Sequence, residues 1–196
     1  MGAVLFGFDP STTKTGWAAV DHASGAPIEN GVQDTQKVRR QFSDRGAAGS
    51  LYFAYKELVG SLFDRFRVAP TIYVEGMYIG NNRNTGLVLA SASGTMVGVC
   101  CHYWEHSKIE QIKPWEWREQ VGLEKGSSKQ RIKEAMLDRG WPQELGQDRY
   151  DASAIAMAGY DLLYNPPVFR KKARAKTDAN IKAGLKRRRS TRYRDC

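Results

Sequence analysis

Four carboxylates in this chain have the residue types and the spacing for metal-dependent chemistry. Asp9 and Glu75 each stand at the end of a short apolar run, in the stretches VLFGFD and TIYVE. Asp148 and Asp151 are three residues apart in DRYDASAIAMA, so they share one face of a helix. Four carboxylates that converge repel one another unless cations neutralise them, and hard oxygen ligands of this kind select Mg²⁺ or Mn²⁺.

Two such ions about 4 Å apart can activate a water molecule and stabilise the leaving oxygen of a phosphodiester. Two of the carboxylates also have a simpler local explanation. Asp9 can be the first residue of an ordinary Asp-Pro turn at the sheet edge, and Asp148 can be a helix N-cap. Asp151 is harder to explain, because its apolar neighbours predict that it faces inward, where a lone ionised carboxylate is costly.

The elements that must position these residues follow the chain as strands first and helices later. The opening stretch Val4–Val20 predicts a β-hairpin, with a turn whose small hydroxyl residues and glycine let a ligand approach closely. Further strands are predicted at Ile28–Lys37, Thr71–Met77 and Lys108–Ile112. Helices are predicted at Ala47–Phe66, Asn84–Tyr103, Pro114–Val121, from a cap at Ser127 or Ser128 to Arg139, and at Arg149–Tyr164.

This order predicts an α/β fold with one mixed sheet. In open α/β sheets, ligands collect at the carboxyl ends of neighbouring strands, which is where Asp9 and Glu75 fall. The helix at Asn84–Tyr103 is apolar nearly all round, so we expect it to be buried on two sides, against the sheet and against a second subunit.

The positive charge of the chain is concentrated at its C-terminal end. Residues 165–196 hold 12 Lys and Arg against 2 acidic residues, whereas the whole chain has a net charge of +9. We therefore expect a nuclease-type domain over residues 1–164 and a basic, flexible tail over residues 165–196 that contacts nucleic acid. A solvated, disordered terminus is the alternative. The tail residues assigned to DNA are Lys186, Arg187, Arg188 and Arg189.

Cysteine usage and hydropathy indicate a soluble protein of the cytoplasm. The three cysteines are Cys100, Cys101 and Cys196, and none has metal-ligand spacing. The chain opens on a predicted strand rather than on a targeting segment. Its most apolar run, Leu87–Cys101, is short for a membrane span and contains Ser and Thr, so we expect no membrane partner.

Four stretches together resemble the RuvC family of Holliday junction resolvases. They are GFDPSTTKTGWAAV, IYVEGMY, TGLVLASASGTMVGV and DRYDASAIAMA, and the resemblance runs in order from about residue 3 to residue 160. It implies an RNase H-like fold, with a mixed five-stranded sheet flanked by helices on both faces. It also implies a homodimer formed through the Asn84–Tyr103 helix, and two Mg²⁺ ions per site, for which Mn²⁺ can substitute.

The resemblance implies roles for individual residues. The family's four metal-binding carboxylates fall on the four described above: Asp9 and Asp151 anchor the ions, while Glu75 and Asp148 complete the coordination. The family's aromatic wedge at the junction centre matches Tyr78, although Phe is usual there and a loop aromatic packed on the core is the alternative. A basic pair that contacts DNA matches Arg118 and Lys129; Arg118 replaces the usual Lys, and either residue can instead be a plain surface charge.

These features favour a metal-dependent, structure-selective endonuclease that resolves four-way and related branched DNA by paired phosphodiester hydrolysis, in recombination and repair. Lys129 is expected to stabilise charge that develops at the phosphate. The basic tail departs from the typical bacterial enzyme and suits a phage or viral resolvase. Two alternatives stay open: an RNase H-like nuclease acting on RNA or RNA–DNA hybrids, and a non-catalytic nucleic-acid-binding protein of the same fold.

Overall fold

The structure is a computed structural model that describes residues 3–76, 83–143 and 146–164. The chain divides into two compact units, Met1–Asp161 and Leu162–Cys196. The sheet and the candidate site belong to the first unit. Tyr78 and the four tail residues Lys186, Arg187, Arg188 and Arg189 lie outside the described residues.

A mixed five-stranded sheet is the centre of the first unit, as predicted. Its strands run in the order β3-β2-β1-β4-β5. β2 is antiparallel to both β1 and β3, whereas β4 is parallel to both β1 and β5. The strand bounds are β1 Val4–Asp9, β2 Thr15–Asp21, β3 Pro27–Gln33, β4 Thr71–Glu75 and β5 Lys108–Ile112.

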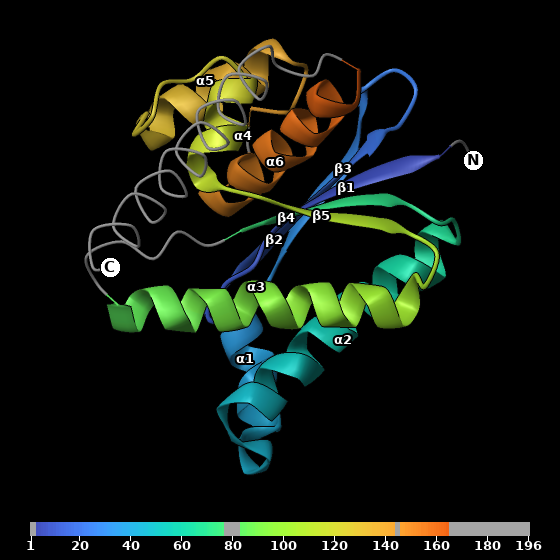
Figure 1. Cartoon of the computed structure of the whole chain (residues 1–196), viewed down its shortest axis with the longest axis vertical. Helices are drawn as coiled ribbons and strands as arrows, with labels where there is room; N and C mark the ends of the chain where they lie inside the picture. The colour runs from blue at the N-terminus through green and yellow to red at the C-terminus, as the bar shows by residue number, and fades with distance from the viewer. Residues whose placement is uncertain (1–2, 77–82, 144–145, 165–196) are drawn as a thin grey trace, which may run out of the picture. The chain divides into compact units, whose positions relative to one another are not determined.

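Helices cover both faces of the sheet, which confirms the predicted architecture. Figure 1 shows α2 and α3 on one side of the strands and α4, α5 and α6 on the other. The helix bounds are α1 Thr35–Gln41, α2 Gly46–Phe66, α3 Arg83–Tyr103, α4 Pro114–Gln120, α5 Lys129–Asp138 and α6 Gln147–Tyr164, with a 3₁₀ turn at Ser43–Arg45.

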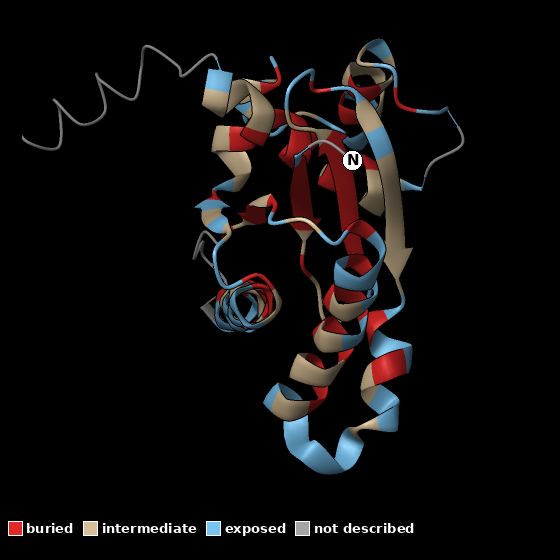
Figure 2. Ribbon diagram, turned by 90° about the vertical axis from the view of Figure 1, so that its right-hand side faces the viewer, coloured by how far each residue is buried: buried red, intermediate tan, exposed pale blue. Residues whose placement is uncertain are grey.

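The two faces of β1 pack against different helices, because successive side chains point to opposite faces of a strand. Val4, Phe6 and Phe8 join the hydrophobic core that lies under α2 and α3. The ring of Phe6 meets that of Phe66 from α2 edge to face, with the ring centroids 5.1 Å apart. Figure 2 shows the central strands as buried. The other face of β1, which ends in Asp9, is turned toward α6.

Glycine allows α6 to lie directly against this second face. A Cβ atom at Gly7 of β1 would collide with the backbone of Ala156, and one at Gly16 of β2 would collide with the carbonyl oxygen of Asp148. In the opposite direction, a Cβ at Gly159 of α6 would run into the ring of Tyr73 on β4. The start of α6 is therefore held close to the ends of β1 and β2.

The prediction of a strand over Ile28–Lys37 is wrong at its end. The strand stops at Gln33, and α1 begins at Thr35. Two polar contacts favour the helix. The Oδ1 atom of Asp34 accepts a hydrogen bond from the Lys37 N–H at 2.8 Å, and the Thr35 hydroxyl shares a buried hydrogen bond with that of Thr15 at 2.7 Å.

The long apolar helix α3 has one buried side. Its buried residues include Met96, Val99 and Cys100, which join the core under the sheet. Leu87 and Val88 are about half exposed, at 51% and 50%. The second side of α3, which was predicted to be buried against another subunit, is therefore exposed to solvent in the single chain. By length and composition alone the segment Asn84–Tyr103 is also apolar enough to cross a membrane, a weak criterion that buried helices of soluble proteins meet as well.

Candidate active site

Asp9 and Glu75 end two neighbouring parallel strands at the same level. The strands pair in register up to Phe8 and Val74, so Asp9 and Glu75 are the next residues along β1 and β4. Alternation turns both side chains toward α6. The two residues predicted as strand-end ligands are therefore neighbours across β1 and β4, close enough for the charge of Glu75 to add to burial in raising the pKa of Asp9.

Asp148 and Asp151 lie in the first two turns of α6, above the same end of the sheet. The helix begins at Gln147, so Asp148 is inside the first turn and the N-cap alternative is wrong. Gly16, the β2 partner of Asp9, lies against the backbone of Asp148. The Oδ1 atom of Asp151 accepts a hydrogen bond from the side-chain amide of Gln147 at 2.9 Å.

The site carries an excess of negative charge. Burial raises the pKa of Asp9 well above its ordinary value, and repulsion from Glu75, Asp151 and Asp148 raises it further. Burial also raises the pKa of Asp151. For Asp151 the hydrogen bond from Gln147 and nearby positive charges act in the opposite direction. The four carboxylates thus influence one another electrostatically, as the sequence predicted.

The chemistry of these side chains suits a hard divalent cation, because the donors are carboxylate oxygens and their mutual repulsion is what such an ion relieves. The side chains do not form a closed ligand set in their present conformations. Within the part of the chain that the structure describes, no three His, Cys, Asp or Glu side chains converge on a common point. The donor type and the charge of these side chains fit Mg²⁺.

The two predicted basic residues of the body flank this site. Lys129 opens α5, is exposed, and follows Ser128, whose Oγ accepts the Arg131 N–H at 3.4 Å as the predicted N-cap. Arg118 lies in α4 and is half-buried. The charges of Lys129 and Arg118 both lower the pKa of Asp151, which brings this pair within electrostatic reach of the carboxylates.

Sequence patterns missed a tryptophan that contacts the site. The indole N–H of Trp117 donates a hydrogen bond to the Oε1 atom of Glu75 at 2.8 Å. Trp117 is 1% exposed, and the guanidinium carbon of Arg118 lies 4.2 Å from the centre of its ring. A buried indole N–H usually has a hydrogen-bond acceptor, so the residue type alone predicts an acceptor but does not identify Glu75.

The turn after Asp9 is held by a polar network that the sequence also left unassigned. The Ser11 carbonyl accepts hydrogen bonds from the hydroxyls of Thr15 at 3.2 Å and of Tyr55 at 3.1 Å. Arg39 from α1 donates to the Thr12 carbonyl at 3.2 Å. Burial raises the pKa of Tyr55, and the charge of Asp9 adds to that shift. The loop beside Asp9 is therefore fixed from β2, α1 and α2.

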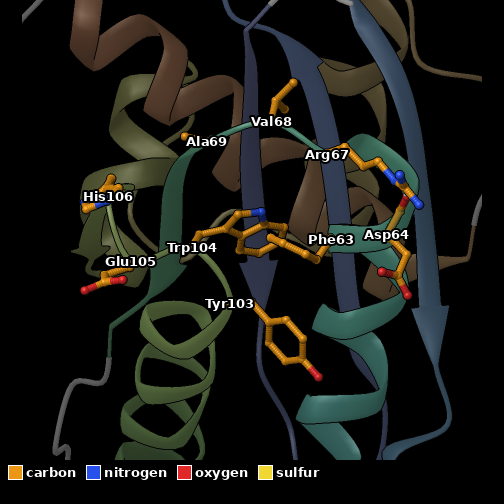
Figure 3. A pocket seen from close by; sticks show the side chains of 9 residues that line it. All are labelled: Phe63, Asp64, Arg67, Val68, Ala69, Tyr103, Trp104, Glu105 and His106. Carbon is orange, nitrogen blue, oxygen red and sulfur yellow. Dashed lines mark hydrogen bonds between the residues drawn. The ribbon is translucent and has the colours of Figure 1, made fainter.

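A cavity of about 600 Å³ lies at the other end of the sheet, where the chain enters β4 and β5. Figure 3 shows Phe63 and Trp104 close together in its lining, with ring centroids 6.2 Å apart. None of the predicted site residues that the structure describes lines it. The cavity is thus separate from the carboxylates, which lie at the carboxyl ends of the parallel strands.

No protein-family model matches this chain, and no curated protein matches it in sequence. Solved structures do match it. T. thermophilus RuvC in complex with Holliday junction substrate is similar to 84% of this chain over 97% of its own length, with a TM-score of 0.63 and 16% sequence identity. A second structure, of Thermus thermophilus RuvC, matches 83% of this chain and 97% of its own length, with the same TM-score and identity. The chain therefore has the fold of RuvC, an RNase H-like fold built on a mixed five-stranded sheet.

Proposed function

We propose that this protein is a metal-dependent endonuclease that cuts branched DNA, above all four-way junctions. The observation that supports the proposal is that Asp9 and Glu75 end neighbouring parallel strands beside the first turns of α6, where Asp148 and Asp151 lie close enough to act on Asp9 electrostatically. A solved structure with the same fold is a RuvC protein in complex with Holliday junction substrate. Membership of the RuvC family, suggested by the sequence motifs, is part of this proposal.

Asp9, Glu75, Asp148 and Asp151 would hold Mg²⁺, which when bound supplies Lewis acidity toward water and toward the phosphodiester. Burial raises the pKa of both Asp9 and Asp151, and we assign to these two the anchoring of the ions. Glu75 and Asp148 would complete the ligand set. Lys129 and Arg118 would bind the DNA backbone beside it, and Lys129 would stabilise negative charge that develops at the cleaved phosphate.

A homodimer would let two such sites act on paired strands of one junction. We propose that α3 forms the interface, because Leu87 is an apolar residue, about half exposed, on the side of the helix away from the buried Met96. Val88 is equally exposed beside it, at the edge that faces α2. Paired sites explain how two strands could be cut symmetrically. Two assignments remain proposals on residues outside the described part of the chain: Tyr78 as the aromatic wedge, and the basic tail as a source of further phosphate contacts.

A labelled four-way DNA junction tests the proposal. The purified protein is incubated with the junction with and without Mg²⁺, and cuts are mapped on all four strands. Paired symmetric nicks that require Mg²⁺ are expected, and Asp9→Asn should bind the junction without cutting it. Preferred cutting of an RNA–DNA hybrid would favour the RNase H-like alternative. Junction binding without any Mg²⁺ affinity or cleavage would favour a non-catalytic binding protein.

A further inference from the structure

We propose that Trp117 is a positioning residue for Glu75, which it holds by one carboxylate oxygen so that the other faces the metal site. The inference rests on the proposed metal-dependent function and adds a residue to it. Its starting point is the 2.8 Å hydrogen bond from the indole N–H of Trp117 to Oε1 of Glu75. An indole nitrogen donates and cannot accept, so Trp117 can orient a carboxylate but cannot relay a proton.

Trp117 is itself rigidly placed with respect to Glu75. In the sheet Glu75 pairs with Ile112, whose carbonyl also accepts the Gly76 N–H at 2.7 Å. Two residues later α4 begins at Pro114, a residue suited to the first helical position. Only five residues therefore separate the strand partner of Glu75 from Trp117, and the indole is almost wholly buried at 1% exposure.

Arg118 contacts Trp117 and also acts electrostatically on Asp151. Its guanidinium stacks over the Trp117 ring at 4.2 Å and donates to the Pro114 carbonyl at 3.0 Å. Its charge also acts on Asp151. Neighbouring residues of one short helix thus serve two carboxylates: Trp117 fixes Glu75 by a hydrogen bond, and Arg118 places positive charge near Asp151.

Orientation of Glu75 matters because Mg²⁺ accepts little departure from octahedral geometry. Without the indole N–H, the Glu75 carboxyl is free to turn relative to Asp9, its neighbour across β1 and β4. Partners that orient a metal ligand typically change metal affinity by about 10- to 100-fold when they are removed. We expect an effect of that size from loss of the Trp117 N–H alone.

Trp117→Phe tests this, because it keeps an aromatic ring and removes the N–H. Calorimetric titration of the full-length protein with Mg²⁺ should show about 10- to 100-fold weaker binding. The melting temperature in EDTA should stay within a few degrees of wild type. Trp115→Phe is the matched control: Trp115 lies in the same helix with its ring 5.8 Å from the Lys113 ammonium, and its loss should leave Mg²⁺ affinity unchanged.

A second background separates positioning from general damage. In Glu75→Gln protein, Trp117→Phe should cause little further loss of Mg²⁺ affinity, because the residue acts through Glu75. Wild-type affinity in Trp117→Phe, or an equal loss in both backgrounds, would overturn the inference and leave the proposed nuclease standing. Absence of Mg²⁺ binding by the wild-type protein would instead overturn the proposed function itself.

An NMR measurement on unmodified protein covers the case in which Trp117→Phe does not fold. The chain has five tryptophans, so ¹⁵N-labelled protein gives a small set of indole N–H signals that backbone-linked experiments can assign. The Trp117 indole signal should shift on addition of Mg²⁺, whereas that of Trp104, which lines the distant cavity, should not. If the chemical shift of the Trp117 indole N–H does not change at saturating Mg²⁺, the proposed contact with a metal ligand is contradicted.

Discussion

Asp9 and Glu75 end two neighbouring parallel strands at the same level, with both side chains on the face turned toward α6. Burial raises the pKa of Asp9, and the negative charge of Glu75 raises it further. Without a cation the site is therefore electrostatically unfavourable when both groups are ionised. This electrostatic repulsion should lower the stability of the metal-free protein, which can be measured without any substrate.

Asp9→Asn should stabilise the metal-free protein at neutral pH, because burial and the neighbouring carboxylates raise the pKa of Asp9 and make its ionised form unfavourable in the folded protein. The Asn amide carries no charge and can donate to Glu75. The pKa of Asp9 is raised in the folded protein, so its favourable contribution is complete below its ordinary value of 3.8 and is lost as the pH rises through the folded pKa. Urea denaturation in EDTA should thus show a gain at pH 7.5 that shrinks toward pH 4.5. A variant less stable than wild type at pH 7.5 would contradict the assignment.

Gly16→Ala should destabilise the fold and displace α6. The added methyl group would collide with the carbonyl oxygen of Asp148, and forced overpacking of this kind costs about 1–3 kcal/mol. Gly94→Ala is the control, since a Cβ there meets no atom within 4 Å and alanine favours a helix by up to about 1 kcal/mol. Denaturation midpoints should move in opposite directions. Equal shifts would show that α6 does not depend on the close approach at Gly16.

Local sequence patterns were sufficient for most elements and for the four carboxylates. Strand ends carry Asp9 and Glu75 because each is the first polar residue after an apolar run, and helical spacing places Asp148 and Asp151 on one face. The partnership of Trp117 with Glu75 was beyond such reasoning, because 42 residues separate them and only the parallel pairing of β4 with β5 brings them together.

The missed helix α1 has a different cause. Its seven residues contain little apolar periodicity, and only Thr35 and Val38 are buried. The helix depends on Asp34 as its cap and on the contact between Thr35 and Thr15, which is twenty residues away in the chain. A weak local preference is thus decided by a tertiary contact, as is common for short elements.

Lys129→Ala should lower the cleavage rate at saturating DNA by about 10²- to 10³-fold, the usual effect of removing a preorganised positive or donor group at a reacting centre. Junction binding should weaken much less, because one phosphate contact among many is lost. Lys133→Ala is the control within the same helix; its ammonium lies over the Tyr150 ring at 5.9 Å. Single-turnover cleavage and gel-shift titration separate the two effects. An equal loss of rate in both variants would show that Lys129 has no special role.

Leu87→Glu and Val88→Glu should each convert a dimer into a monomer, by raising the dissociation constant about 10-fold or more. Both side chains are about half exposed; Leu87 is on the open side of α3, and Val88 is at its edge, where it lines a cavity with Leu51 of α2. A charge buried by association would oppose the dimer. Ile28→Glu is the matched control, because Ile28 is 47% exposed on β3. Sedimentation velocity over a range of concentrations reports the state. A dimer that survives both α3 substitutions would place the interface elsewhere.

Replacing residues 186–189 (KRRR) by glutamine should weaken junction binding and make it less sensitive to salt. Each phosphate contact that is lost should reduce the slope of log affinity against log salt by about 0.9, while the cleavage rate at saturating DNA stays near wild type. Lys108→Gln is the control, since the Lys108 ammonium is already paired with Glu110 at 2.8 Å. Fluorescence anisotropy from low to moderate salt measures both slopes. An unchanged slope in the tail variant would mean that these four residues make no phosphate contact, and that affinity depends on the residues around Lys129 and Arg118.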